Sequence, residues 1–85
     1  MLVSVAILVQ NASNNYDLCY GGITKNGISL YNMFTELRNS NGAQGNIVIP
    51  MTFIPVQNGD VIGAYANGNE TTNIRKIYLN VKKIG

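Results

Sequence analysis

The sequence predicts an all-β protein, an antiparallel β-sandwich or jelly roll of about six strands, in a single domain spanning residues 1–85. Two observations support this class. Short runs rich in Val, Ile, Tyr, Thr and Phe, the residues that favour strands, recur along the chain. Polar breaks separate these runs, and four of them contain Asn-Gly, the strongest short-range turn signal: Asn26-Gly27, Asn41-Gly42, Asn58-Gly59 and Asn67-Gly68.

The composition indicates that this small domain needs a second place to bury apolar side chains. A chain of 85 residues buries only about 60–65% of its unfolded surface. Yet 46% of the residues are hydrophobic and 12% are charged, against about 25% charged in typical domains. We therefore expect a homo-oligomer. The net charge of +2 is too small to indicate a nucleic-acid or membrane partner.

The residue types leave little room for catalysis. Histidine is absent and Cys19 is the single cysteine, which excludes Ser-His and Cys-His pairs, an intrachain disulfide and a thiolate metal cluster. Cys19 is expected to be a small buried residue. A glycosidase needs two carboxylates that face each other across the substrate. The four carboxylates are Asp17, Glu36, Asp60 and Glu70. Asp60 suits a turn and Glu70 a loop, so the sequence does not indicate such a pair. We expect no catalytic residue, no metal and no cofactor.

The first run, Leu2 to Gln10, is predicted to be a strand that is apolar on both faces. One face carries Val3, Val5, Ile7 and Val9, and the other carries Leu2, Ala6 and Leu8. This run has no basic segment before it and no small-residue cleavage pattern after it, and it is shorter than the ~20 residues of a membrane-spanning helix. We expect a soluble chain with no signal peptide and no membrane partner.

The next two strands are expected at Tyr16–Lys25 and from Ile28 to about Phe34. Gly21-Gly22 indicates a bulge or the close approach of another backbone. The third run has two interpretations, because Leu30, Met33, Phe34 and Leu37 also fit a helical stripe. The β-branched Ile28 directly after an Asn-Gly turn favours a strand. Residues 39–46 are expected to form a loop.

A hairpin is predicted around Asn58-Gly59, with Gln57 opposite Asp60 and Ile54 opposite Gly63. Its arms belong to strands at Ile47–Gln57 and Val61–Ala66. The first arm should lie at an edge or carry a bulge, because Pro50 and Pro55 cannot donate to a ladder. Both faces of the hairpin are apolar, as are those of the first strand. We therefore expect an oligomer interface that includes Leu8, Val5, Phe53, Ile62 and Ala64.

The last strand is predicted at Ile74–Ile84, with a buried face (Ile77, Leu79 and Val81) and a solvated face (Lys76, Tyr78, Asn80 and Lys82). The solvated face permits an alternative function. Lysines with an aromatic among them, and Arg75 and Lys83 close by, are typical of small β-barrels that bind single-stranded nucleic acid. A solvated edge that blocks sheet-to-sheet pairing explains the same lysines. The low net charge favours that second interpretation.

The run Ile54-Pro55-Val56-Gln57-Asn58-Gly59-Asp60-Val61-Ile62 resembles a pattern near the C-terminus of phage tail-fibre and receptor-binding tips. The same pattern occurs in related jelly rolls of the tumour-necrosis-factor and complement type. The polar loop at 67–73 and the strand at Ile74–Ile84 occupy the matching places, and the opening at residues 2–7 is also similar. The resemblance implies a trimeric sandwich at the end of a virion fibre or spike, binding a host surface. This chain is shorter than most such domains, which implies that one or two strands are missing or are supplied by a neighbour. The alternative is a small accessory subunit that caps or assists a longer fibre protein.

Binding is expected in loops at one end of the sandwich, because strands hold loops in place without constraining their sequence. The candidate loops are 11–16 and 67–73. They supply amides, hydroxyls and one aromatic ring, which suit an uncharged saccharide. The predicted ligand-binding residues are Tyr16, Asn14, Asn15, Asn67, Asn69 and Thr71.

Overall fold

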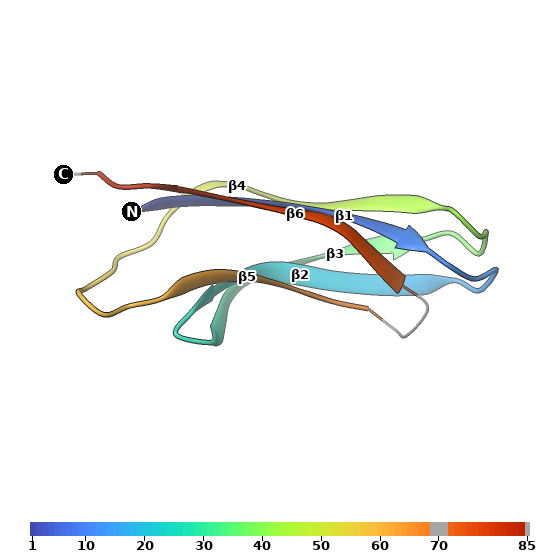
Figure 1. Cartoon of the computed structure of the whole chain (residues 1–85), viewed down its shortest axis with the longest axis horizontal. Coiled ribbons are helices and arrows are strands. Elements are labelled where there is room, and N and C mark those ends of the chain that lie inside the picture. The colour runs from blue at the N-terminus through green and yellow to red at the C-terminus, as the bar shows by residue number, and fades with distance from the viewer. Residues whose placement is uncertain (69–71, 85) are drawn as a thin grey trace.

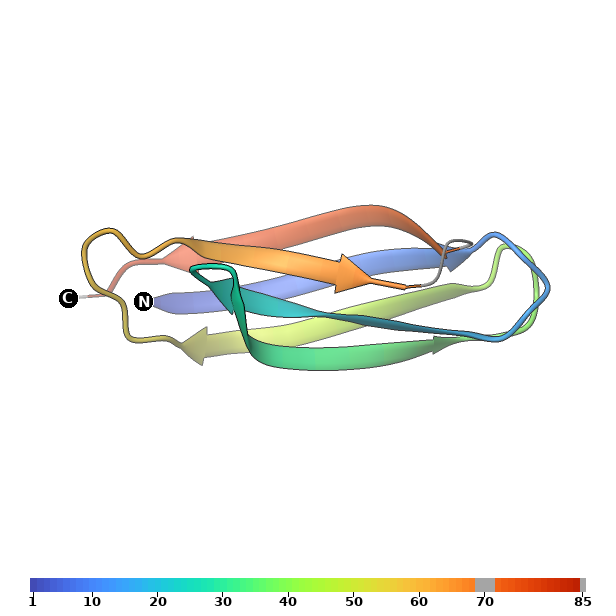
Figure 2. The ribbon, with the colours of Figure 1, turned by 90° about the horizontal axis from the view of Figure 1, so that it is seen from below.

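A computed structural model describes residues 1–68 and 72–84 and confirms the all-β class. The described residues form six strands: β1 (Leu2–Asn11), β2 (Asp17–Lys25), β3 (Ile28–Leu37), β4 (Gln44–Phe53), β5 (Ile62–Asn67) and β6 (Thr72–Lys82). They make two antiparallel three-stranded sheets, ordered β4-β1-β6 and β3-β2-β5. The sheets lie face to face in an elongated sandwich of 47 × 19 × 15 Å (Figures 1 and 2). No helix that could cross a membrane occurs among the described residues.

The core lies between the central strands β1 and β2. One of the two apolar faces predicted for β1 is the buried, inward row: Val3, Val5, Ile7 and Val9. Cys19 and Ile23 of β2 belong to the same buried cluster. Burial raises the pKa of the Cys19 thiol, and the nearby charge of Asp17 adds to this, so the thiol stays protonated at neutral pH. Val5, which was predicted at an oligomer interface, is only 2% exposed within its own chain and belongs to this core.

The turn at Asn26-Gly27 joins β2 to β3 as a hairpin, which confirms that the third run is a strand. Asn26 and Gly27 have φ of 55° and 80°, the two positive angles of a type I′ turn, and Lys25 pairs with Ile28. The strand continues to Leu37, beyond the expected end near Phe34. The side chain of Leu37 is fully buried, so packing against the core extends the strand beyond Phe34 to Leu37.

The hairpin predicted at Asn58-Gly59 does not form, because β4 and β5 belong to different sheets. A tight turn is present, with the Asp60 N–H donating to the Gln57 carbonyl over 3.1 Å. However, only Gly59 has a positive φ, whereas a type I′ hairpin needs two. The N–H and carbonyl of Val61 are both engaged by Asn26, which holds this segment beside the β2–β3 turn. The segment therefore crosses from one sheet to the other, with Ile54 buried on the way.

Two predictions about strand irregularities are confirmed. Pro50 lies on β4, an edge strand, near a register shift between Val3 and Val5 of its partner. Gly21 and Gly22 are points of close approach in the middle of β2. A Cβ at Gly21 would lie 2.7 Å from the Ile7 side chain, and one at Gly22 would collide with the main-chain carbonyl oxygen of Tyr31. The glycine pair thus lets β2 lie close to the facing sheet at Gly21 and to the neighbouring strand β3 at Gly22.

The last strand does not have the predicted buried face. Ile77, Leu79 and Val81 point to the same side as the buried residues Ile7, Val5 and Val3 with which they pair. They nevertheless remain 37–47% exposed. The reason is that the facing edge strand, β5, spans six residues against eleven in β6 and presents mainly small side chains. The alternation predicts the side to which these residues point, but β5 is too short to cover them.

Candidate functional site

The end of the sandwich opposite the N-terminus is organised by Asn11, the last residue of β1 (Figure 1). Its side-chain amide is fully buried and donates to the carbonyls of Asn15 (2.7 Å) and Arg38 (2.9 Å). Its carbonyl oxygen accepts from the N–H of Ser13 at 3.0 Å. One asparagine therefore fastens the β1–β2 loop to the β3–β4 loop.

Three of the predicted binding residues lie at this end. The side-chain oxygen of Asn14 accepts from the N–H of Asn41 over 3.0 Å, which joins it to the β3–β4 loop. Asn15 and Tyr16 are exposed beside it, and the Tyr16 ring is 56% accessible. Partial desolvation raises the pKa of Tyr16, and the negative charge of Glu36 raises it further. The hydroxyl of Tyr16 is therefore a neutral donor and acceptor at physiological pH.

The other predicted residues are not gathered there. Asn67 ends β5 and pairs with Tyr20, four residues along from Tyr16, which corresponds to about 13 Å of strand. Asn69 and Thr71 lie outside the described residues. The structure thus brings together Asn14, Asn15 and Tyr16, and places Asn67 farther along the sheet.

A polar hollow of about 560 Å³ lies on the β3–β4 side of this end. We call it the loop-end hollow; it is lined by Glu36, Arg38, Ser40, Asn41, Gly42, Ala43 and Gln44. Glu36 and Arg38 are not among the predicted site residues. The predicted strand ends near Phe34 and the predicted loop begins at residue 39, so neither residue was assigned to an element. The Tyr16–Glu36 proximity connects the predicted residues to this hollow.

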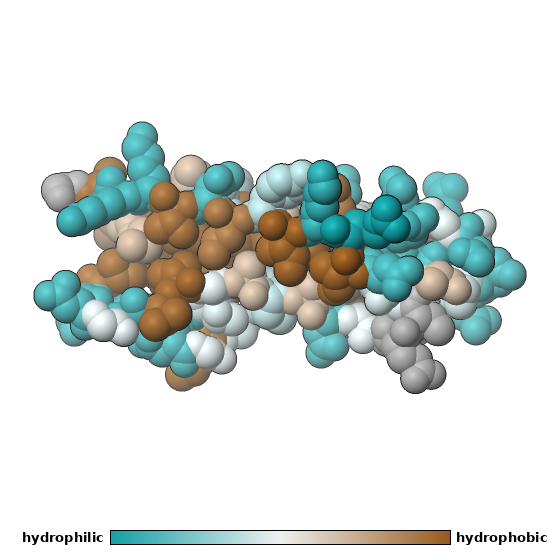
Figure 3. Space-filling model, in the orientation of Figure 1, coloured by the Kyte–Doolittle hydropathy of each residue, from teal (hydrophilic) through white to brown (hydrophobic). Residues whose placement is uncertain are grey.

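A second surface runs along the side of the sandwich where β5 faces β6. We call it the apolar edge. It consists of the inward row of β6 (Ile74, Ile77, Leu79 and Val81) and the half-buried inward row of β5 (Ile62, Ala64 and Ala66). Figure 3 views this side and shows hydrophobic side chains gathered in a band between the two layers. Of the residues predicted at an interface, Ile62 and Ala64 belong to this edge.

Leu8 and Phe53 lie elsewhere. Leu8 is half-buried on the outer face of the β4-β1-β6 sheet, between Asn46 and Lys76. Phe53 is 58% exposed at the end of β4. The predicted interface residues therefore occupy several different surfaces and do not form one patch.

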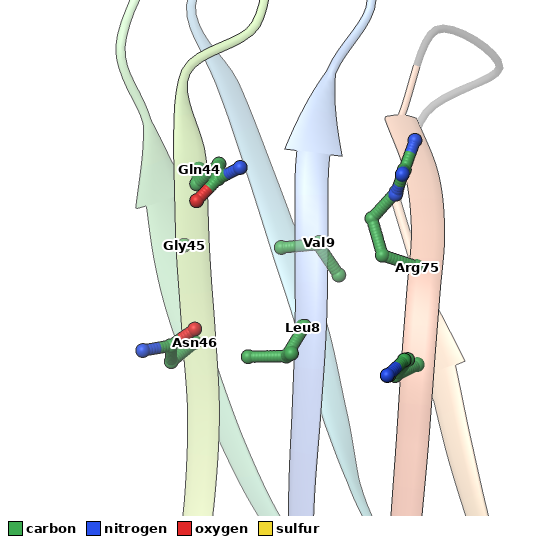
Figure 4. Close-up of a pocket in the computed structure, with 7 residues that line it drawn as sticks. Leu8, Val9, Gln44, Gly45, Asn46 and Arg75 are labelled. Carbon is green, nitrogen blue, oxygen red and sulfur yellow. The ribbon is translucent and has the colours of Figure 1, made fainter.

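A third surface is a depression of about 240 Å³ on the outer face of the β4-β1-β6 sheet. It is lined by Leu8, Val9, Gln44, Gly45, Asn46, Arg75 and Lys76 (Figure 4). The ladder between β1 and β6 shifts register here: Leu8 pairs with Lys76 but Val9 pairs with Ile74, so Arg75 is an extra residue in β6. Lys76, Tyr78 and Lys82 share this outer face, as predicted, and the Lys76 ammonium lies 6.0 Å from the Tyr78 ring centroid.

The described carboxylates are dispersed over the molecule. Asp17 is buried on the inner side of the β3-β2-β5 sheet, whereas Glu36 pairs with Leu18 on the outer face of that sheet. Asp60 lies at the opposite end, 3.6 Å from the Lys25 ammonium. Hydrogen bonds from the Asn26 amide and the Gln57 N–H, and then the charge of Lys25, lower the pKa of Asp60. Among the described residues no three acidic or cysteine side chains are grouped as metal ligands would be.

Comparisons with protein-family models, with curated proteins and with solved structures give no match to this chain.

Proposed function

We propose that this protein is a non-enzymatic module of a phage fibre tip, which assembles as a homotrimer and binds a saccharide on the host surface. The trimer and the virion location follow from the resemblance of residues 54–62 to tail-fibre tips. The observation that carries the proposal is the apolar edge: an inward-facing row of β6 that its own chain leaves uncovered.

The apolar edge has the character of an unfinished core. Each of its β6 residues pairs with a buried β1 residue, as Ile77 does with Ile7 and Leu79 with Val5. The basic residues Lys76 and Lys82 project from the other face, so nothing charged on β6 solvates this row. A contiguous apolar surface on a small domain marks an interaction site.

A second copy of the chain is the occupant that fits this edge best. Every described strand is already used in one of the two sheets, so none of these strands is left to cover β6. With 12% charged residues and a net charge of +2, copies repel one another only weakly. Covering the four β6 residues would contribute about 2–5 kcal/mol per copy, from the usual value of ~1.5–3 kcal/mol for a fully buried side chain. This is a substantial share of the stability of a small domain.

A charge at the apolar edge should dissociate the assembly. Replacing Ile77 by Lys places an ammonium in the centre of the edge, where a partner would have to desolvate it. The monomer should still fold, because Ile77 is 46% exposed and lysine can extend its charge into water. Light scattering is expected to give the mass of one chain, 9.2 kDa, for Ile77→Lys.

The matched control is Tyr78→Lys, the next residue on the same strand. Tyr78 points to the outer face, so this variant introduces the same charge away from the edge and should retain the parent mass. Equal dissociation by both variants would contradict an interface at the apolar edge.

The loop end supports the saccharide part of the proposal. The loop-end hollow combines the Arg38 guanidinium, the Glu36 carboxylate and the polar Ser40 and Asn41, beside the exposed Tyr16 ring. An exposed aromatic next to paired donors and acceptors suits a sugar, which offers hydroxyls on its rim and C–H groups on its faces. Weak binding by each site becomes useful when an oligomer repeats it.

Replacing Tyr16 by Ala should weaken binding to host-cell surfaces or to a glycan array by about tenfold, equivalent to ~1.4 kcal/mol. Tyr20→Ala is the matched control, because Tyr20 is an exposed tyrosine on β2, the strand that directly follows Tyr16, and its ring lies tilted against that of Phe34 at a centroid distance of 6.1 Å. Binding that depends on Tyr20 and not on Tyr16 would move the site from the loop end to the face of the sheet.

A further inference from the structure

Two cations lie next to each other on the outer face of the β4-β1-β6 sheet because of the bulge in β6. In a regular strand, adjacent residues point to opposite faces. Here Ile74 and Ile77, three residues apart, both point inward, since they pair with the buried Val9 and Ile7. Arg75 and Lys76 therefore both project from the outer face, where they line the depression above Leu8. The bulge thus places two cations side by side on the outer face, where a regular strand would place one.

Within residues 1–68 and 72–84, neither of these cations is paired with a carboxylate. The ion pair found among the described residues joins Lys25 and Asp60, at the other end of the molecule. The remaining residues that line the depression are uncharged. Two like charges held next to each other repel, so the arrangement has a cost in the isolated chain that a bound anion would offset.

The neighbours of the cations are suited to a sugar ring. Gln44 and Asn46 on β4 supply amide donors and acceptors, and Leu8 on β1 supplies an apolar floor (Figure 4). The guanidinium of Arg75 can bind a carboxylate or sulfate through two parallel hydrogen bonds, and the Lys76 ammonium adds a point charge. A volume of about 240 Å³ is below the usual ~300–1,000 Å³ of drug-sized pockets, so the depression would hold one unit of a longer chain.

From this geometry we propose that the depression is an anion subsite, which takes the carboxylate or sulfate of an acidic saccharide through Arg75 and Lys76. The inference rests on the proposed role in saccharide binding and specifies a charged ligand for it. The site is separate from the apolar edge, which lies on the inner side of the same strand. It also differs in charge from the loop-end hollow, whose Arg38 is accompanied by Glu36.

Nucleic acid is less well suited to this surface. Sheets that bind single strands combine several stacking aromatics with a continuous basic track. On the outer face of β6 the described aromatic is Tyr78, next to the Lys76 ammonium. The next cation on that face is Lys82, six residues or about 20 Å farther along the strand. Two cations followed by a long uncharged interval match a single acidic group better than a row of phosphates.

The test compares the chain with two charge-matched variants. Arg75→Gln with Lys76→Gln removes the paired cations, and Lys82→Gln with Lys83→Gln removes the same charge from the other end of the strand. Binding is measured to heparin, to polygalacturonate, to neutral dextran and to oligo(dT). We expect the parent to bind the two acidic polysaccharides more tightly than dextran or oligo(dT). The first variant should weaken that binding about tenfold, and the second less than threefold.

Equal losses in the two variants would overturn the proposal, because they would show attraction by net charge alone. Oligo(dT) binding as tight as heparin binding, or no binding to either acidic polysaccharide, would overturn it too. Light scattering and circular dichroism on the same samples keep the outcomes apart. Neither variant alters the apolar edge, so the oligomer mass and the fold report on the proposed assembly independently of the anion subsite.

Discussion

Replacing Gly22 by alanine is expected to lower the free energy of unfolding by about 3 kcal/mol or more, although it adds only one methyl group. The new Cβ would collide with the main-chain carbonyl oxygen of Tyr31, in the strand that β2 pairs with. A backbone atom in a ladder cannot rotate away as a side chain can, so β3 would have to separate from β2. Urea unfolding followed by circular dichroism measures the loss.

Gly63→Ala is the matched control. The nearest atom to its new Cβ is the side-chain hydroxyl oxygen of Thr24, 2.9 Å away, and that hydroxyl can change rotamer. The control should therefore cost much less than Gly22→Ala. Comparable stability of Gly22→Ala and the parent would mean that the two strands do not approach as closely as the structure shows.

The second large effect is expected at Asn11. Asn11→Ala removes the amide that satisfies the carbonyls of Asn15 and Arg38, and both carbonyls would then lack their internal donor at the loop end. An unsatisfied buried polar group costs about 1–3 kcal/mol, so we expect a loss of roughly 2–4 kcal/mol. The same unfolding experiment measures this loss.

Asn14→Ala provides the comparison, because Asn14 is exposed and accepts a single bond from Asn41. It should change stability by less than about 1 kcal/mol. If Asn11→Ala is no more destabilising than Asn14→Ala, the loops are held by their own backbone and not by the buried asparagine.

Local chemistry was enough to predict the strands and one of the turns. The alternation placed Val3, Val5, Ile7 and Val9 together on one face of β1, but both faces of this run are apolar, so the period of two did not show which face packs in the core. Asn26-Gly27 identified a true hairpin, because both residues adopt the positive φ that the turn requires.

The same dipeptide at Asn58-Gly59 led to the wrong prediction that the two flanking strands pair as a hairpin, for a physical reason. An Asn-Gly pair predicts a reversal of the chain, but it does not determine whether the two arms pair with each other. Here the hydrogen bonds of Val61 to Asn26 hold the second arm beside the β2–β3 turn, and Ile54 is buried where the first arm leaves the other sheet. These contacts are distant in the sequence, so no local pattern predicts them.

The surfaces could be predicted only in part. Asn14, Asn15 and Tyr16 do lie at a loop end, because the end of β1 was evident from the sequence. The apolar edge could not be predicted from the sequence. The alternation of Ile77, Leu79 and Val81 shows to which side they point, but it does not show how long the strand that faces them is. The spacing Ile74-Arg75-Lys76-Ile77 does contain a signal for the bulge, because two inward residues three apart break the period of two.

The proposed assembly depends on whether the chain covers its apolar edge with copies of itself. Light scattering coupled to size exclusion, on the unmodified chain at micromolar concentration, measures this without any ligand. We predict about 28 kDa, the mass of three chains of 9.2 kDa. A stable monomer of 9.2 kDa would contradict the proposal, because the inward row of β6 would then remain exposed to water or be reserved for a different protein.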